Sequence, residues 1–190
     1  MFIRTLLRAA AAATTATIMA ATCACDNADF DYSGERCYFI FDNSKHQDAT
    51  LQSALNPMAP GIFCRIYEGQ EGGSLFFYFK NNHGLDSKKK ANAEDIRRTR
   101  QIGVYNKSGI IVGYAPDGML YAFDCQCPNC YYDTAMANYK LTMNTAGIAT
   151  CNSCKREYDL NNNGLCANGR KLIKYRASCS GPLGVLSVVN

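Results

Sequence analysis

The sequence predicts an all-β domain, and three observations support this fold class. Beyond residue 36 the chain consists mainly of short runs rich in aromatic and β-branched residues, which are typical of strands. Gly, Asn, Asp and Pro separate these runs and can form the turns between strands. The chain has 190 residues, 47% of them hydrophobic and 19% charged, so one domain can bury an ordinary globular core.

The first 24 residues have the layout of a secretory signal peptide. The positively charged "MFIRTLLR" precedes the weakly apolar run "AAAAATTATIMAA", which is too short to span a bilayer. Small residues then lead to a cysteine. The segment resembles the signal of a bacterial lipoprotein, which implies a signal peptide over residues 1–24 and lipid attachment at Cys25. Cys25 follows Ala24, whereas the other candidate, Cys23, follows Thr22.

Residues 25–36 then form an acidic, polar tether that resembles those of lipoproteins in the Bacteroidetes group. This interpretation predicts a protein of the bacterial cell envelope, anchored to a membrane through its lipid on the periplasmic or surface side. A mitochondrial transit peptide is the alternative, since such peptides also carry arginine and lack acidic residues.

The charge balance argues against nucleic acid as a partner. The formal net charge is +4, and removal of Arg4 and Arg8 with the signal leaves 18 basic and 16 acidic side chains, a net charge of about +2. The basic run "KKK" at residues 88 to 90 is partly neutralised by Asp86, Glu94 and Asp95. We expect a solvated loop or a short helix there.

Ten strands are expected in residues 37–190. They cover residues 37 to 41, 61 to 67, 74 to 80, 101 to 106, 109 to 115, 119 to 124, 139 to 143, 147 to 151, 171 to 177 and 184 to 189. Tight turns are predicted at residues 106 to 109, 116 to 118 and 161 to 164, where Gly or Asn can adopt positive φ. The aromatic run "SLFFYFK" at 74 to 80 is interpreted as a strand buried on both faces rather than a ligand platform. His46 and His83 lie in polar turn contexts and are predicted to be surface residues.

Two CxxC pairs carry the strongest chemical signal. Cys127 and Cys130 form the first, Cys151 and Cys154 the second, and 20 residues separate them. Two such pairs can direct four sulfurs to the corners of a tetrahedron, about 2.3 Å from one metal ion, as in zinc ribbons and rubredoxin-like sites. The spacing therefore predicts a metal-binding subdomain at residues 125–159. Thiolates accept zinc, mononuclear iron or a [2Fe–2S] cluster, so the metal stays open.

The residues around these pairs resemble a Rieske iron–sulfur domain. The resemblance is carried by "GIIVGYAPDGMLYAFDCQCPNC", "CNSCKREYDLNNNG" and "KLIKYRASCSGPLGVLSV", in that order. It implies a small Rieske-like β-barrel or sandwich over residues 37–190. The chain departs from the family at the ligands, because Asn129 and Cys154 stand where that family has its two histidines. A His-ligated Rieske centre is therefore not expected.

Five further cysteines lie in the predicted domain and could form up to two disulfides. They are Cys37, Cys64, Cys125, Cys166 and Cys179. Cys125 is also a competing ligand, although only Cys127 completes a CxxC turn. Arg156 and Glu157, beside the second pair, could form a salt bridge or contact the cysteine sulfurs, but they are interpreted as surface residues.

Three functions remain open from the sequence, and none of them makes the protein an obvious enzyme. The first is a tethered Rieske-like domain in which zinc, or a similar single ion, is structural. The second is electron transfer through iron or [2Fe–2S], with a redox or envelope protein as partner. The third is a binding module in which the CxxC pairs form disulfides, or exchange them. Export of an unfolded chain favours zinc, because a cluster assembled in the cytoplasm would not cross with it, and no twin-arginine motif is present.

Overall fold

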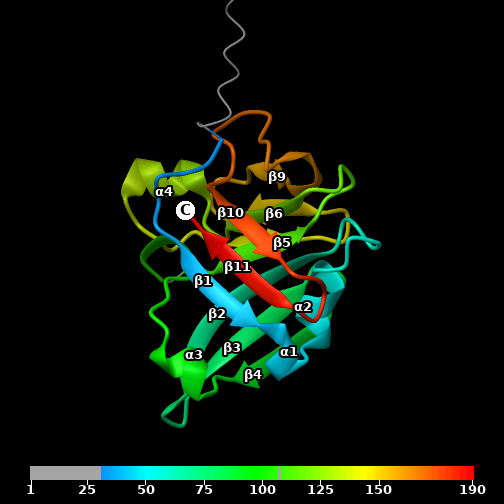
Figure 1. Ribbon diagram of the computed structural model, residues 1–190. Coiled ribbons are helices and arrows are strands. Elements are labelled where there is room, and N and C mark those ends of the chain that lie inside the picture. The colour runs from blue at the N-terminus through cyan, green and yellow to red at the C-terminus, as the bar shows by residue number, and fades with distance from the viewer. Residues whose placement is uncertain (1–30, 107) are drawn as a thin grey trace, which may run out of the picture. The chain divides into compact units, whose positions relative to one another are not determined.

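The computed structural model describes residues 31–106 and 108–190, and residues Tyr32–Asn190 form a compact unit (Figure 1). The predicted signal peptide, Cys23 and the predicted lipid-attachment residue Cys25 lie outside the described residues, as does Lys107 in the turn predicted at 106 to 109. Among the helices that are described, none combines the length and the apolar character needed to cross a membrane.

Eight strands form one antiparallel sheet that curls into a half-barrel, in the order β1-β11-β10-β6-β5-β2-β3-β4. Their bounds are β1 Tyr38–Asp42, β2 Phe63–Glu71, β3 Ser74–Asn81, β4 Asp86–Lys90, β5 Ile110–Tyr114, β6 Leu120–Asp124, β10 Lys174–Cys179 and β11 Val185–Val189. The turn between β2 and β3 consists of Gly72 and Gly73, whose φ angles are 56° and 76°. Glycine is favoured there because a two-residue hairpin needs positive φ at both positions.

A second, three-stranded sheet is inserted in the chain between β6 and β10. Its strands are β7 Leu141–Met143, β8 Ile148–Cys151 and β9 Glu157–Asp159, in the order β7-β8-β9. Together with α4 (Pro128–Thr134) it forms what we call the metal-binding subdomain, residues 125–165. In Figure 1, β9 and α4 lie at one end of the compact unit and β4 at the other.

Short helices connect the strands, and polar side chains begin three of them. α1 is Asn43–His46, α2 is Ala49–Ala54 and α3 is Ala93–Arg97, while η2 (Val104–Asn106) and η3 (Leu160–Asn162) are 3₁₀ turns. Asp42, Asp48 and Asn92 are the N-cap residues of α1, α2 and α3, and each side chain accepts a hydrogen bond from a backbone N–H in the first turn. These caps explain why helices form in runs as short as four residues.

One face of the large sheet packs a main core dominated by phenylalanine. Phe39, Phe41, Phe77 and Phe79 are each no more than 1% exposed and make ring contacts with centroids 5.2 to 5.9 Å apart. Helix α2 covers this core with Leu51, Ala54 and Leu55. A separate subdomain core contains Phe63, Ile111 and Phe123 from the opposite face of the sheet, packed against Cys127, Cys130, Cys151 and Tyr158 among others.

The predicted all-β fold with a four-cysteine subdomain is confirmed, and nine of the ten predicted strands overlap observed strands. The strand predicted at 101 to 106 is wrong. Gln101 makes one bridge to Tyr38, and the chain then turns through η2, with φ of 76° at Gly103 and 52° at Tyr105. The turn is held because the Val104 N–H donates to the buried Asp124 carboxylate at 2.6 Å.

The lysine run at 88 to 90 forms a strand where none was predicted. Its residues belong to β4, an edge strand paired with β3, instead of a loop or helix. Lysines are suited to a sheet edge because their charges discourage pairing with another chain. The short helix expected in this region begins only after Asn92, as α3.

β3 is buried on one face only, which corrects the interpretation of "SLFFYFK". Phe77 and Phe79 enter the main core at 1% exposure, whereas Phe76 and Tyr78, on the opposite face, are half-buried. The predicted turns at 116 to 118 and 161 to 164 are present, with positive φ at Gly118, Asn163 and Gly164.

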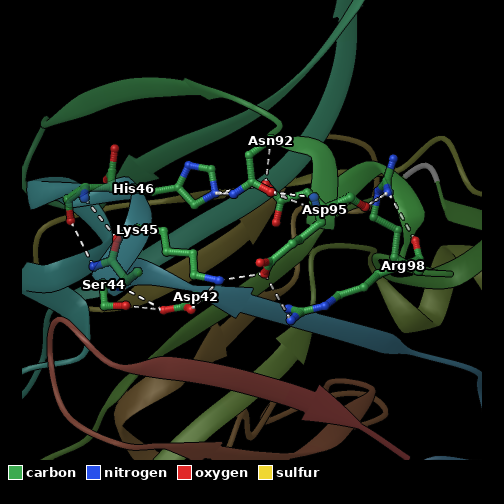
Figure 2. Close-up of polar contacts among 11 residues, drawn as sticks. Asp42, Ser44, Lys45, His46, Asn92, Asp95 and Arg98 are labelled. Carbon is green, nitrogen blue, oxygen red and sulfur yellow. Dashed lines mark hydrogen bonds and ion pairs between the residues drawn. The ribbon is translucent and has the colours of Figure 1, made fainter.

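His83 is exposed as predicted, but the prediction for His46 is wrong. The His46 side chain is only 6% exposed, stacks on Phe41 with ring centroids 4.5 Å apart, and has Nε2 2.9 Å from Asp95 Oδ2 (Figure 2). Lys45 Nζ also lies 2.6 Å from Glu94 Oε2, so residues from α1 and α3 meet although they are 49 positions apart. Turn composition indicated exposure because this tertiary contact is not visible in the local sequence.

Candidate metal centre

The four predicted ligands converge between α4 and the second sheet. Cys127 immediately precedes α4 and Cys130 lies in its first turn, while Cys151 ends β8 and Cys154 lies in the turn before β9. Their sulfur atoms all lie within 4.8 Å of one another. Three of the cysteines are buried and Cys154 is partly exposed. The four cysteines are therefore positioned to bind a metal ion.

The sulfur–sulfur distances match a single tetrahedral ion. Cys127 Sγ lies 3.6 Å from Cys154 Sγ, and Cys130 Sγ lies 3.9 Å from Cys151 Sγ. A tetrahedron whose corners are about 2.3 Å from its centre has edges of about 3.8 Å. Both contacts join one CxxC pair to the other, and all nine described cysteines are free thiols. The structure therefore brings the two pairs together without a disulfide inside either pair.

The first pair is held by the beginning of a helix. Cys127 is the N-cap of α4, with φ of −65° and ψ of 113°, and Pro128 occupies the first helical position. Proline fits that position because its φ is already helical and the missing N–H has no partner in the first turn. The Cys130 backbone N–H donates to the Cys127 sulfur. The pair thus lies on a helix start rather than on the isolated tight turn expected from the sequence.

The second pair is held by a turn that closes on the backbone of β8. The Lys155 N–H donates to the Cys151 carbonyl at 2.9 Å, and the Cys151 N–H donates to the Arg156 carbonyl at 3.0 Å. Lys155 has φ of 60°, in the left-handed region that only a few per cent of non-glycine residues adopt. This conformation reverses the chain directly after Cys154, so that both sulfurs of the pair face α4.

A buried hydrogen-bond chain supports the Cys127 sulfur. Tyr158 is fully buried, and its hydroxyl lies 3.0 Å from Cys127 Sγ. Asn129 Nδ2 donates to the same hydroxyl at 2.8 Å, and Asn129 Oδ1 accepts from the Arg170 N–H at 3.1 Å. Because the tyrosine oxygen already accepts from Asn129, its own O–H is available to donate to the sulfur. Donors of this kind orient a ligand and stabilise its thiolate form.

Arg156 supports the partly exposed ligand, which corrects its interpretation as a plain surface residue. Its side chain hydrogen-bonds Cys154, and its Nε donates to the Asn168 carbonyl at 3.2 Å. Burial opposes ionisation of Cys154, but hydrogen bonds from the Arg156 backbone, from Cys130 and from the Arg156 side chain lower its pKa to about 6.

The thiols of Cys130 and Cys127 are harder to ionise in the absence of a metal. Burial raises the pKa of Cys130, and thiol contacts with Cys154 and Cys127 raise it further. Burial also raises the pKa of Cys127, against the opposing hydrogen bonds from the Cys130 backbone and Tyr158. A bound cation would overcome this penalty, because metal binding deprotonates coordinating thiols.

The remaining five cysteines do not join the group. Cys125 is fully buried and its thiol contacts the Leu141 carbonyl at 3.6 Å, away from the four sulfurs. Cys37, Cys64, Cys125, Cys166 and Cys179, which the sequence marks as possible disulfide partners, are all free thiols in the structure. Burial, with a smaller contribution from the negative charge of Asp124, raises the pKa of Cys37 to about 12, which makes this thiol unreactive.

Comparison with known proteins adds no family assignment, since neither a scan against protein-family models nor a search of curated proteins finds a match. The Rieske-like assignment thus stays a prediction carried by the residues quoted above.

The sequence analysis missed the supporting roles of Asn129 and Tyr158, and it set aside the contact of Arg156 with a cysteine sulfur. A partial signal existed for the first two. Tyr158 is the aromatic residue of the strand "EYD" that the Rieske resemblance includes, and Asn129 stands at a histidine position of that family. Their hydrogen bonds join positions 29 to 41 residues apart, so the local pattern could not indicate them.

Proposed function

We propose that the protein is an envelope lipoprotein whose Rieske-like domain carries one structural metal ion, zinc, bound by Cys127, Cys130, Cys151 and Cys154. The observation that supports this most strongly is the sulfur geometry, with contacts of 3.6 and 3.9 Å and all four sulfurs within 4.8 Å. Four sulfur ligands fill a tetrahedral shell and leave no position for a substrate, as expected of a structural site.

The short strands of the subdomain supply the reason for such a site. β7, β8 and β9 contain three, four and three residues, which is too few to form a stable sheet in isolation. The four cysteines contribute much of the buried interior between these strands and α4. A metal ion bound by four thiolates would link the loop at Cys127 to the loop at Cys151, and its binding free energy would add to the stability of the fold.

Mononuclear zinc is favoured over a [2Fe–2S] cluster on two grounds. A two-iron cluster distributes the thiolates over two irons joined by bridging sulfides, which separates the two sulfur pairs by more than a tetrahedral edge. The predicted export of an unfolded chain also favours an ion acquired after translocation. Lipid attachment through Cys25 would keep the folded domain at the membrane.

Electron transfer through a single iron is the second candidate. The hydrogen bonds to Cys127 and Cys154 support it, because donors to the sulfurs help to set the potential of an iron–thiolate site. The Rieske-like sequence pattern also supports it, as does the partial exposure of Cys154. The same four residues would act as ligands, and a redox protein would be the partner.

Elemental analysis of protein purified from the cell envelope tests the proposal. We expect one zinc per chain and no visible absorption. One iron per chain with charge-transfer absorption would support electron transfer instead, two irons with acid-labile sulfide would support a [2Fe–2S] cluster, and absence of metal would overturn the metal site itself.

The anchoring part of the proposal has its own test. Cells producing the wild type and Cys25→Ser are labelled with a palmitate analogue and fractionated. We expect label and membrane association in the wild type only, and a labelled Cys25→Ser protein would contradict attachment at this residue.

A further inference from the structure

The sheet face opposite the main core is covered over only part of its area. The metal-binding subdomain packs on this face around Phe63, Ile111 and Phe123. The part formed by β2, β3 and β4 carries six side chains that we call the outer array, namely Arg65, Tyr67, Tyr78, Lys80, Asp86 and Lys88. They range from half-buried to exposed, and the side chains of Lys80, Asp86 and Lys88 are 51 to 64% exposed.

The outer array is ordered by strand register in two rows across three strands. Tyr67 lies opposite Tyr78, which lies opposite Lys88. In the neighbouring row, Arg65 lies opposite Lys80, which lies opposite Asp86. Because alternate residues of a strand share a face, all six side chains point to the same side of the sheet. An aromatic row and a charged row therefore run side by side.

The aromatic row is held in a fixed orientation. The rings of Tyr67 and Tyr78 are stacked, with centroids 4.9 Å apart and planes 8° apart, and the Arg65 guanidinium lies 4.7 Å from the Tyr67 centroid. A Cβ atom on Gly69 would come within 3.1 Å of Tyr78 Cε2. The absence of a side chain at Gly69 thus lets the Tyr78 ring lie over β2.

A hollow of about 380 Å³ lies beside these rings. Tyr67, Tyr78, Lys80, Asp86 and Lys88 are among the residues that line it. This volume is in the range of sites for small ligands, which combine apolar walls with a few polar groups. Both donors and acceptors of hydrogen bonds surround the rings here.

The charged side chains of the outer array can exchange their present ion-pair partners for a ligand at little cost in free energy. Lys80 lies 3.5 Å from Asp86, and Lys88 lies 2.7 Å from Glu71, in pairs that are well exposed. Such exposed pairs contribute about 0 to 1 kcal/mol and exchange readily. Arg65, Lys80 and Lys88 outnumber Asp86 and Glu71, and Lys90 adds a further cation two residues beyond Lys88. The array therefore favours an anionic ligand.

We propose that the outer array binds an acidic glycan, a polysaccharide whose sugar rings carry carboxylates. The C–H face of a sugar ring can pack on Tyr78, on the side of its ring that does not stack on Tyr67, as apolar groups pack on aromatic rings elsewhere. Its carboxylates pair with Lys80 and Lys88, and its hydroxyls donate to Asp86. This site is separate from the four-cysteine site and does not depend on the metal.

A single-stranded nucleic acid fits the array less well. Tyr67 and Tyr78 stack on each other at 4.9 Å, so no base can enter between them. Asp86 and Glu71 would also face the phosphates, which are more densely charged than the carboxylates of a glycan.

Calorimetric titration of the purified full-length protein with polygalacturonate tests the proposal, at about 0.15 M salt to limit non-specific attraction. Dextran, polyglutamate and single-stranded polyuridylate are titrated in parallel. We expect binding to polygalacturonate only. Tyr78→Ala should weaken it roughly tenfold or more, and Lys80→Gln several-fold with a smaller salt dependence.

Two variants control for loss of structure. Tyr78→Phe keeps the ring and removes only the hydroxyl bonded to Glu71, so it should retain binding. Tyr38→Ala removes a 47% exposed tyrosine from β1, at the opposite edge of the sheet, and should have no effect. Circular dichroism and metal content should match the wild type in each variant.

Several outcomes would overturn the proposal. They are absence of polygalacturonate binding, equal binding of polyglutamate or dextran, unchanged affinity in folded Tyr78→Ala, and preferential binding of polyuridylate. None of them would bear on the metal site, whose metal content is measured separately.

Discussion

The half-barrel and the metal-binding subdomain bury their interiors by different means. The main core is filled by large apolar side chains from strands of five to nine residues, with Phe39, Phe41, Phe77 and Phe79 in mutual contact. The subdomain has strands of three and four residues, and four thiols meet in its interior. One region can be stable through apolar burial, whereas the other brings together groups that gain most from a bound cation.

This difference shows why two CxxC pairs can be placed in a protein that already has an adequate core. The long strands bring distant residues together through backbone pairing and phenylalanine packing. The loops around Cys127 and Cys151 pack on apolar side chains such as Phe63, but the strands that carry them are short, and a metal ion would supply a further local constraint. The two regions should therefore lose structure separately.

Removal of the metal should have the largest effect, confined to the subdomain. Cys151→Ser, or treatment of the wild type with a strong chelator, should abolish metal binding and raise hydrogen exchange in β7, β8 and β9 on the order of a thousand-fold. Amides of β2, β3 and β5 should stay protected. Hydrogen exchange followed by mass spectrometry measures both regions at once.

Cys166→Ser is the matched control, because Cys166 packs beside the subdomain core but lies outside the four-sulfur group. It should keep the metal and the exchange pattern of the wild type. Uniform loss of protection throughout the half-barrel after metal removal would contradict the independence of the two regions.

A large-to-small substitution in the main core should destabilise the half-barrel and leave metal binding intact, which is the opposite of the effect of metal removal. Phe41 is fully buried and contacts Phe77, Phe79 and His46. Phe41→Ala should lower the free energy of unfolding by about 3 to 5 kcal/mol through lost burial and a cavity. The folded fraction should still contain one metal per chain. Urea unfolding with metal analysis checks this, and loss of metal from folded Phe41→Ala would show that the regions are coupled.

Breaking the hydrogen-bond chain to Cys127 should have an intermediate effect on metal binding. Tyr158→Phe removes the O–H near the sulfur and an acceptor for Asn129, at a cost of about 1 to 3 kcal/mol. Metal affinity should fall about 10- to 100-fold with unchanged stoichiometry. Competition with a chromophoric chelator measures this, and Tyr139→Phe, in the same subdomain, serves as the control. Equal affinity in Tyr158→Phe and wild type would argue against a role for this hydroxyl.

The smallest expected effect concerns Asp124, which joins the two regions. Its carboxylate accepts from the Gln126 N–H at 2.7 Å and from the Tyr175 hydroxyl at 2.8 Å. Burial raises the pKa of Asp124 despite these bonds. The folded protein therefore binds more protons than the unfolded chain between the two pKa values, so this group's contribution to stability falls as pH rises through that range.

Asp124→Asn lacks this titration and provides the comparison. The unfolding free energy of the wild type minus that of Asp124→Asn should decrease as pH rises from about 4 toward neutrality. Urea unfolding of both proteins over this range gives the difference, in which effects of metal loss cancel. A difference that increases with pH would contradict the raised pKa.

The strands were predictable where side-chain pattern and backbone pairing agree. "CYFIF" and "SLFFYFK" are rich in strand-forming residues, and both overlap observed strands. β4 was missed because "DSKKK" lacks such residues and forms a strand only by pairing with β3. The segment at 101 to 106 has strand-like composition, but the hydrogen bond from Val104 to Asp124 turns it away.

The four cysteines were predictable because spacing alone brings two sulfurs to one side of a turn. Their environment was not. Tyr158 and Asn129 act through contacts with residues on other loops, and the buried position of His46 depends on Asp95 in α3. Such contacts depend on how the elements pack, which composition and local spacing do not encode.

X-ray absorption spectroscopy of the purified protein tests the central claim most directly, because it reports the atoms around the metal. The proposed site predicts four sulfur scatterers at about 2.3 Å from a single zinc ion and no second metal in the next shell. A metal–metal contribution, or a shell that contains nitrogen or oxygen ligands in place of sulfur, would contradict coordination of one ion by Cys127, Cys130, Cys151 and Cys154.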